Sequence, residues 1–276
     1  MGKLRTTLTL ARSSGSVLRA DPELLVLPLL SGVASMVVAA SFVVPLFLVG
    51  GTDAEPTPVA YALLFVMYVV LAVVTIFFNA ALIAGARERL QGGDPTVASA
   101  LGAASTRIGQ ILPWAVISAT VSILLQAARQ RGGAVGAGAA SVAGLAWSLV
   151  TFLVLPIIVI EGLPIRAAIS RSKELFKRTW GGNVAARAGF GVLGFLLVLP
   201  AILLVVLGAA AGNVGLGIAI AIAVVWLVVV TLVMASLSSI FQAALYLHAS
   251  GHQVSGDHFT TGQLEQAFGA AGATQG

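Results

Sequence analysis

Residues 164–180 have the sequence PIRAAISRSKELFKRTW and lie between two long apolar runs. At 100° per residue, the apolar side chains of Ile165, Ile169 and Phe176 fall on one face, while the charged side chains fall on the opposite face. Trp180 ends the segment, and tryptophan collects at membrane–water interfaces. The segment therefore predicts an amphipathic helix that lies in the plane of a membrane interface.

Composition places the whole chain in the same environment. Hydrophobic residues make up 58% of the 276 residues and charged residues only 9%, with a mean hydropathy of +1.02. Such a chain cannot cover the surface of a soluble domain with polar side chains, which indicates an integral membrane protein. The sequence has no cysteine, which excludes disulfides, thiolate metal sites and cysteine nucleophiles.

Apolar runs of about 20 residues or more are long enough to cross a bilayer as helices. We therefore predict an all-α polytopic membrane helix bundle with six spans, at about residues 24–50, 59–84, 111–128, 139–160, 185–211 and 216–247. The first run is too long for the apolar core of a cleavable signal peptide, so it is expected to remain as a span. Connections are predicted as an acidic turn at 50–58, a glycine-rich loop at 132–138 and a short turn at 212–217.

The spans group into three hairpins, and an amphipathic segment precedes each of them. These segments are residues 3–19, 95–108 and 164–180, and the second is expected to begin at a cap formed by Asp94 and Pro95. This layout predicts a six-span membrane domain over 1–249, followed by a flexible cytoplasmic tail at 250–276.

Basic residues are unevenly divided between the two ends of the predicted spans. Thirteen Lys and Arg residues fall on the side of the N-terminus and the amphipathic segments, whereas only Arg129 and Arg131 fall on the other side. Because cytoplasmic loops are enriched in Lys and Arg, both termini are predicted to be cytoplasmic. The expected location is a bacterial plasma membrane, with the three amphipathic helices on its cytoplasmic face.

The basic face of segment 164–180 is the first candidate site. It carries five bases and one acid, and each base near an anionic leaflet contributes about 1 kcal/mol. The candidate residues for lipid head groups or partner proteins are Arg166, Arg171, Lys173, Lys177 and Arg178. Glu161 precedes this segment and is expected to pair with a neighbouring arginine.

A second candidate site is a polar cavity between spans. Asn79 is the strongly polar residue of the second span, and the third span is the least apolar, with Ser118, Ser122 and Gln126 along it. If these side chains line one cavity, the protein is a small-solute permease. A lone intramembrane asparagine more commonly forms an interhelical hydrogen bond.

Catalytic and metal-binding patterns are sparse. No acidic residue, lysine or histidine falls in the middle of a predicted span, which argues against a proton-coupled pump. His248 and His252 are four residues apart on one helix face, which suits either a metal site or an interfacial pair. We predict no metal, no cofactor, no enzyme activity and no nucleic-acid partner.

A family resemblance adds to this interpretation. The pattern of residues 161–181, together with Leu10 to Ser31 and Ala243 to Ala249, resembles a family of uncharacterised six-span bacterial membrane proteins. Distant relatives resemble the membrane domain attached to some glycerophosphodiester phosphodiesterases. The resemblance implies a six-helix membrane fold with no catalytic residue to carry over, and the richness in Ala, Val and Gly resembles that of an actinobacterium.

Two functions follow as alternatives. The first is a non-enzymatic membrane module that binds anionic lipid head groups, or other membrane proteins, through its basic cytoplasmic face. The second is a small-solute permease.

Overall fold

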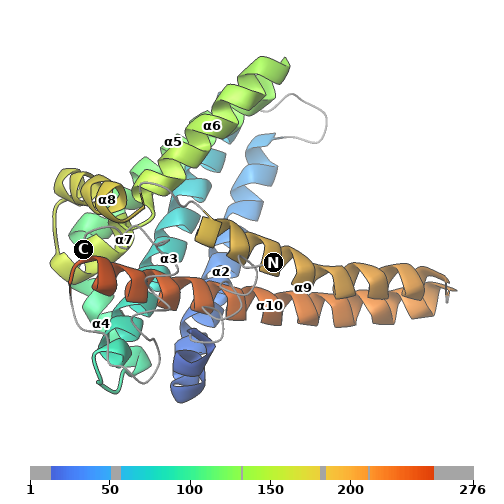
Figure 1. Cartoon of the computed structure of the whole chain (residues 1–276). Helices are drawn as coiled ribbons and strands as arrows, with labels where there is room; N and C mark the ends of the chain where they lie inside the picture. The colour runs from blue at the N-terminus through green and yellow to red at the C-terminus, as the bar shows by residue number, and fades with distance from the viewer. Residues whose placement is uncertain (1–13, 51–56, 132, 181–184, 211, 252–276) are drawn as a thin grey trace. The chain divides into compact units, whose positions relative to one another are not determined.

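The structure is a computed structural model, and it describes residues 14–50, 57–131, 133–180, 185–210 and 212–251. Side chains are described throughout these ranges except at 50, 134–135, 176–180 and 185–194. Every regular element within them is helical (Figure 1). After a helical stretch at 14–20, the elements are η1 (Pro22–Leu25), α2 (Val26–Gly50), α3 (Pro58–Leu90), α4 (Val97–Ser105), α5 (Ile108–Arg131), α6 (Gly133–Thr151), α7 (Val154–Glu161), α8 (Ile165–Trp180), α9 (Ala185–Ala210) and α10 (Gly212–Ala249).

The chain divides into two compact units. One unit contains residues 26–85 and 95–177, and the other contains residues 1–25, 86–94 and 178–276. Two of the boundaries fall inside α3 and α8, and neither unit is a continuous segment of sequence.

In the unit of residues 26–85 and 95–177, α5 and α6 form an antiparallel hairpin and lie side by side (Figure 1). The indole rings of Trp114 and Trp147 stack between them, with centroids 6.0 Å apart. Near the other end, a Cβ added to Gly136 would lie 3.5 Å from the carbonyl oxygen of Ala128. Gly136 thus lets the two backbones approach closely.

In the other unit, α9 and α10 form a second hairpin (Figure 1). The indole Nε1 of Trp226 donates a hydrogen bond to the carbonyl of Leu197, 2.8 Å away. The second half of α10 is buried from Ser236 to Leu247, apart from two half-buried positions, and η1 packs against α10. This half of α10 therefore packs against protein.

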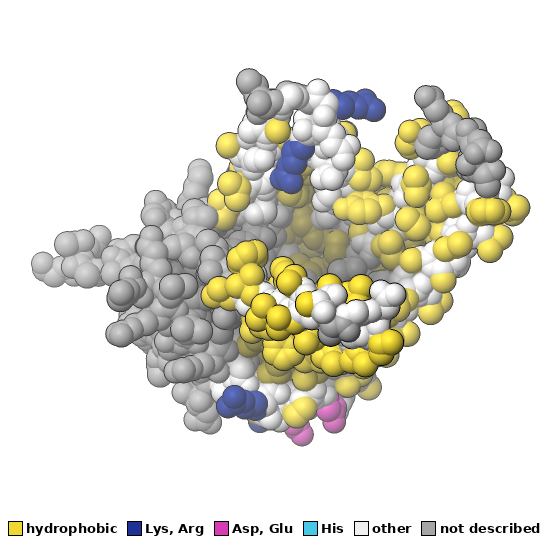
Figure 2. Space-filling view, turned by 90° about the vertical axis from the view of Figure 1, so that its right-hand side faces the viewer, with side chains coloured by type: hydrophobic (Ala, Val, Ile, Leu, Met, Phe, Trp, Pro, Cys, Tyr) yellow, Lys and Arg dark blue, Asp and Glu magenta, His cyan; other side chains and the backbone are white. Residues whose placement is uncertain are grey.

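Exposed apolar side chains cover much of the described surface. Met36, Val43, Phe47 and Leu48 of α2 are each more than 60% exposed. Figure 2 shows hydrophobic side chains over much of the described part of this face, with few charged side chains among them. Five described helices are long and apolar enough to cross a membrane. The protein is therefore an all-α, multi-pass membrane helix bundle, because water could not solvate so much apolar surface.

The sixth predicted span corresponds to α9, whose length of 26 residues is sufficient to cross a bilayer. Its described apolar part, Phe195–Ala210, is shorter than the other five candidates. The count of six spans therefore stays a prediction.

Several sequence predictions of local structure are wrong. The cap of α4 is Thr96, which forms a capping box with Ser99, and not Asp94 with Pro95. The predicted loop at 132–138 is helical from Gly133, and the predicted turn at 212–217 is the first part of α10. Of the predicted tail at 250–276, residues 252–276 lie outside the described residues.

The predicted span at 139–160 corresponds to the candidate span Gly136–Glu161, and a turn at Phe152 and Leu153 divides it into α6 and α7. Pro156 explains the break. A proline ring clashes with the carbonyl four residues earlier, here that of Phe152, but is tolerated in the first turn of a new helix. The chain therefore starts α7 at Val154.

Candidate functional site

The candidate site is built around the corner where α7 meets α8. Gly162 ends α7 with φ +68°, a left-handed conformation that favours glycine, and its N–H donates to the carbonyl of Ile158. Pro164 comes directly before Ile165, the first residue of α8. Proline is tolerated at a helix start, because the first N–H groups of a helix have no partner within it. These residues turn the chain sharply and bring α8 beside the end of α7.

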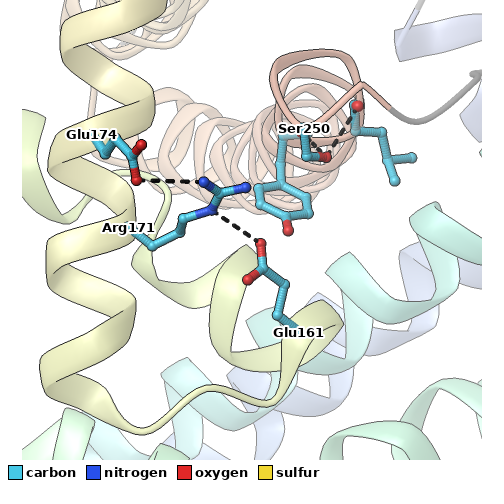
Figure 3. Close-up of polar contacts among 6 residues, drawn as sticks. Glu161, Arg171, Glu174 and Ser250 are labelled. Atoms are coloured by element: carbon cyan, nitrogen blue, oxygen red, sulfur yellow. Dashed lines mark hydrogen bonds and ion pairs between the residues drawn. The ribbon is translucent and has the colours of Figure 1, made fainter.

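Arg171 on α8 forms two ion pairs, one across this corner with Glu161 and one within α8 with Glu174 (Figure 3). Its Nε lies 3.6 Å from Glu161 Oε1, and its Nη1 lies 3.4 Å from Glu174 Oε2. The pair with Glu161 confirms the prediction that this glutamate meets a neighbouring arginine. All three side chains are between a quarter and a half exposed, so each pair contributes at most about 1 kcal/mol to stability. Two carboxylates nevertheless surround the charge of Arg171.

A hydrogen bond holds α8 against the break between α6 and α7. The hydroxyl of Ser172, which is fully buried, donates to the carbonyl oxygen of Val150. In a continuous helix that carbonyl would accept from residue 154, which instead begins α7. Ala168 and Leu175 are buried on the same side of α8. Ser172 therefore satisfies a carbonyl that the break leaves available, and it fixes which face of α8 points inward.

The opposite side of α8 is exposed and carries two cations. Arg166, Ser170 and Lys173 are exposed and follow one another at spacings of four and three, which places them on one helix face. Neither Arg166 nor Lys173 forms an ion pair or side-chain hydrogen bond with another described residue. We call this surface the exposed basic face of α8.

Arg107, just before α5, lies at the same corner. Its Cζ is 2.7 Å from the position that a Cβ on Gly162 would occupy, so the guanidinium packs against the backbone at the end of α7. The C-terminal end of a helix carries partial negative charge, which favours a cation there. The sequence prediction did not include this residue in the site. The only signal for it was that Arg107 is the sole base of the segment at 95–108.

The five basic residues predicted for the site differ in their exposure and pairing. Arg166 and Lys173 are exposed, and Arg171 is paired with glutamates. The side chains of Lys177 and Arg178 lie outside the described residues.

The predicted cavity residues do not all share an enclosed environment. Asn79 on α3 and Ser118 on α5 are half-buried, whereas Ser122 and Gln126 on α5 are exposed. An enclosed cavity would bury all four side chains, so the exposed pair gives it no support.

Metal-ligating residues are not clustered in the described part of the chain, where no group of three or more His, Asp or Glu side chains could hold an ion. His248 is half-buried on α10, and His252 lies outside the described residues.

A charged contact that the sequence did not predict lies in the other unit. Asp21 Oδ2 is 3.0 Å from Arg89 Nε, and the side chain of Asp21 is only 7% exposed. This ion pair joins the start of η1 to the end of α3. Sequence spacing alone does not show that residues 21 and 89 meet.

Comparisons with known proteins identify a family for this chain. No curated protein matches the sequence. A family model described as a family of unknown function (DUF6159) matches residues 58–256, from the start of α3 to beyond α10. The match includes α8 and its corner, but it gives no evidence for the likeness to glycerophosphodiester phosphodiesterase membrane domains or for an actinobacterial source. Because the match covers well over half of the chain, the protein belongs to this uncharacterised family, DUF6159.

Proposed function

We propose that the protein is a non-enzymatic membrane module that holds anionic lipid head groups on the exposed basic face of α8. The observation that carries the proposal is the separation of charges on this helix. Arg166 and Lys173 are exposed without a carboxylate partner among the described residues, while Arg171 is compensated by Glu161 and Glu174. Uncompensated bases attract an anionic leaflet, at about 1 kcal/mol for each base.

Within this proposal, lipid phosphate is the group that the cations bind. Arg166 and Lys173 are the main residues, and Arg107 adds a third cation at the adjacent corner. Arg171 is assigned a structural role, because a phosphate would have to compete with two carboxylates that are already in place. The uneven division of bases along the sequence supports a location of this face at the cytoplasmic leaflet of a bacterial plasma membrane, which is part of the proposal.

The test compares a variant that loses the positive charges at positions 166 and 173 with a control that keeps both charges but exchanges arginine and lysine. The Arg166→Gln/Lys173→Gln variant and the control Arg166→Lys/Lys173→Arg are purified in mild detergent from the same membranes. We expect the glutamine variant to retain less phosphatidylglycerol than the wild type, since two bases are lost at about 1 kcal/mol each, and the control to match the wild type. Equal phosphatidylglycerol in the glutamine variant and the wild type would refute the proposal.

A further inference from the structure

The far end of α5 carries an arginine whose side chain points in an unusual direction. A Cβ added to Gly144 of α6 would lie 2.8 Å from Arg129 Nη2 and 3.7 Å from Leu125 Cδ1. Leu125 precedes Arg129 by one turn, yet both side chains reach the same glycine. The side chain of Arg129 therefore runs back along the hairpin, away from the helix end, and Gly144 provides the space for its guanidinium.

Because of this direction, the guanidinium lies between the two ends of the α5–α6 hairpin and not at its tip. Gly136 lies opposite Ala128, at the end of the hairpin, and Gly144 lies about 12 Å further along α6 at 1.5 Å per residue. Arginines near the ends of transmembrane helices usually extend outward to the head groups. Arg129 instead directs its charge to the depth of Gly144, where an unpaired charge is costly.

Arg129 also continues a polar stripe on α5. Ser118, Ser122, Gln126 and Arg129 are spaced by four, four and three residues, so they share one helix face. Ser122, Gln126 and Arg129 are exposed, and none of them has a side-chain hydrogen bond or ion pair with a described residue. The stripe thus offers hydroxyl, amide and guanidinium donors to a group outside the described chain.

We propose that Arg129, seated in the notch at Gly144, binds the phosphate of an anionic phospholipid, with Gln126 and Ser122 toward its glycerol and ester oxygens. Leu124 and Leu145 are 63% and 61% exposed on the same two helices and offer apolar surface to the acyl chains. A second copy of the chain would bring a like charge to this stripe, which disfavours it as the occupant. This site lies at the opposite end of α5 from Arg107, so it is distinct from the exposed basic face of α8.

The experiment titrates phosphatidylglycerol into the full-length protein in mild detergent and follows the bound lipid by native mass spectrometry. All variants carry Arg166→Gln/Lys173→Gln, so that α8 does not contribute and the outcome is independent of the proposed function. We expect Arg129→Gln to weaken phosphatidylglycerol binding by about tenfold or more, because a hydrogen-bonded ion is lost. The matched control Arg131→Gln removes the same charge two residues away and should leave the affinity unchanged.

Two further variants test the geometry. Gly144→Ala fills the notch and should weaken phosphatidylglycerol binding, whereas Arg129→Lys should give an intermediate affinity, because a lysine cannot form the bidentate contact. If Gly144→Ala does not fold, as judged by size-exclusion chromatography, the Arg129 series alone decides. Excess inorganic phosphate should not displace the lipid, since it lacks the acyl chains.

The proposal is overturned if Arg129→Gln binds phosphatidylglycerol as the parent does, or if Arg131→Gln loses as much affinity as Arg129→Gln. Equal binding of phosphatidylcholine would also overturn it, because the site would then show no preference for an anionic lipid. Displacement of the lipid by inorganic phosphate would overturn it as well, because it would indicate a soluble ligand.

Discussion

Ser172 on α8 donates its hydroxyl hydrogen to the carbonyl of Val150, where α6 gives way to α7. The relationship connects three elements, because the break created by Pro156 supplies the acceptor and α8 supplies the donor. It also decides which residues of α8 face outward, since Arg166 and Lys173 lie on the side opposite Ser172.

Ser172→Ala should therefore destabilise the protein by about 1 to 3 kcal/mol, the cost of leaving a buried acceptor unsatisfied. The measurement is unfolding of the purified protein in mild detergent, followed by tryptophan fluorescence. Ser170→Ala is the matched control on the exposed face of the same helix, and it should change the stability by less than about 0.5 kcal/mol. Equal effects of the two substitutions would show that the hydrogen bond to Val150 is not important.

Asp21→Asn should destabilise the fold because it leaves Arg89 without its buried partner. Breaking a fully buried pair costs roughly 3 to 5 kcal/mol, and since Arg89 is 27% exposed we expect about 2 to 3 kcal/mol. Asp94→Asn is the control, since Asp94 pairs with the same arginine at 3.6 Å but is 93% exposed. Its expected effect is near zero. A larger loss of stability for Asp94→Asn than for Asp21→Asn would contradict the assignment.

Gly208→Ala tests the close approach of α9 and α10. A Cβ at Gly208 would lie 2.9 Å from the carbonyl oxygen of Gly215 and would overlap the Cβ of Ala219. Because backbone atoms must move, we expect a loss of about 1 to 3 kcal/mol in the same unfolding assay. Gly217→Ala meets nothing within 4 Å and should be neutral or stabilising by up to about 1 kcal/mol. A neutral Gly208→Ala would mean that the hairpin is packed more loosely than the structure shows.

The six-span topology predicts on which side of the membrane each connection between helices lies. Reporter fusions after Gly93 and Gly251 should report the cytoplasm, and fusions after Gly133 and Asn213 should report the outside. The fusion after Asn213 is decisive for α9, because a five-span protein in which α9 does not cross would place Asn213 in the cytoplasm. That outcome would remove the sixth span.

Apolar periodicity and length were sufficient to predict the helices. Most predicted spans begin and end within a few residues of α2, α3, α5, α9 and α10, because a membrane span leaves a long, uninterrupted apolar run. The break at Phe152 was not predicted. Pro156 accounts for it in the structure, but three other prolines, Pro45, Pro113 and Pro200, lie inside continuous helices. Proline position alone does not decide between a bend and a break.

The candidate site was predictable only in part. The spacing along α8 placed Arg166 and Lys173 on the polar face, and proximity in sequence suggested the pair of Glu161 with an arginine. Three relationships depend on residues distant in sequence and have no local pattern: Arg107 with Gly162, Ser172 with Val150, and Asp21 with Arg89. Tertiary packing, rather than helical periodicity, determines each of them.

The depth of Ser170 in a bilayer tests the central claim most directly. Ser170 lies between Arg166 and Lys173 on the exposed basic face of α8, and the chain has no cysteine, so Ser170→Cys gives a single labelling site that keeps both bases. Electron paramagnetic resonance then measures the depth of a nitroxide at this site, in vesicles of phosphatidylcholine with and without phosphatidylglycerol. We predict a label at the level of the lipid phosphates when phosphatidylglycerol is present, and a loss of that depth in the Arg166→Gln/Lys173→Gln background. A label equally accessible to a water-soluble relaxation agent in both kinds of vesicle would contradict the account.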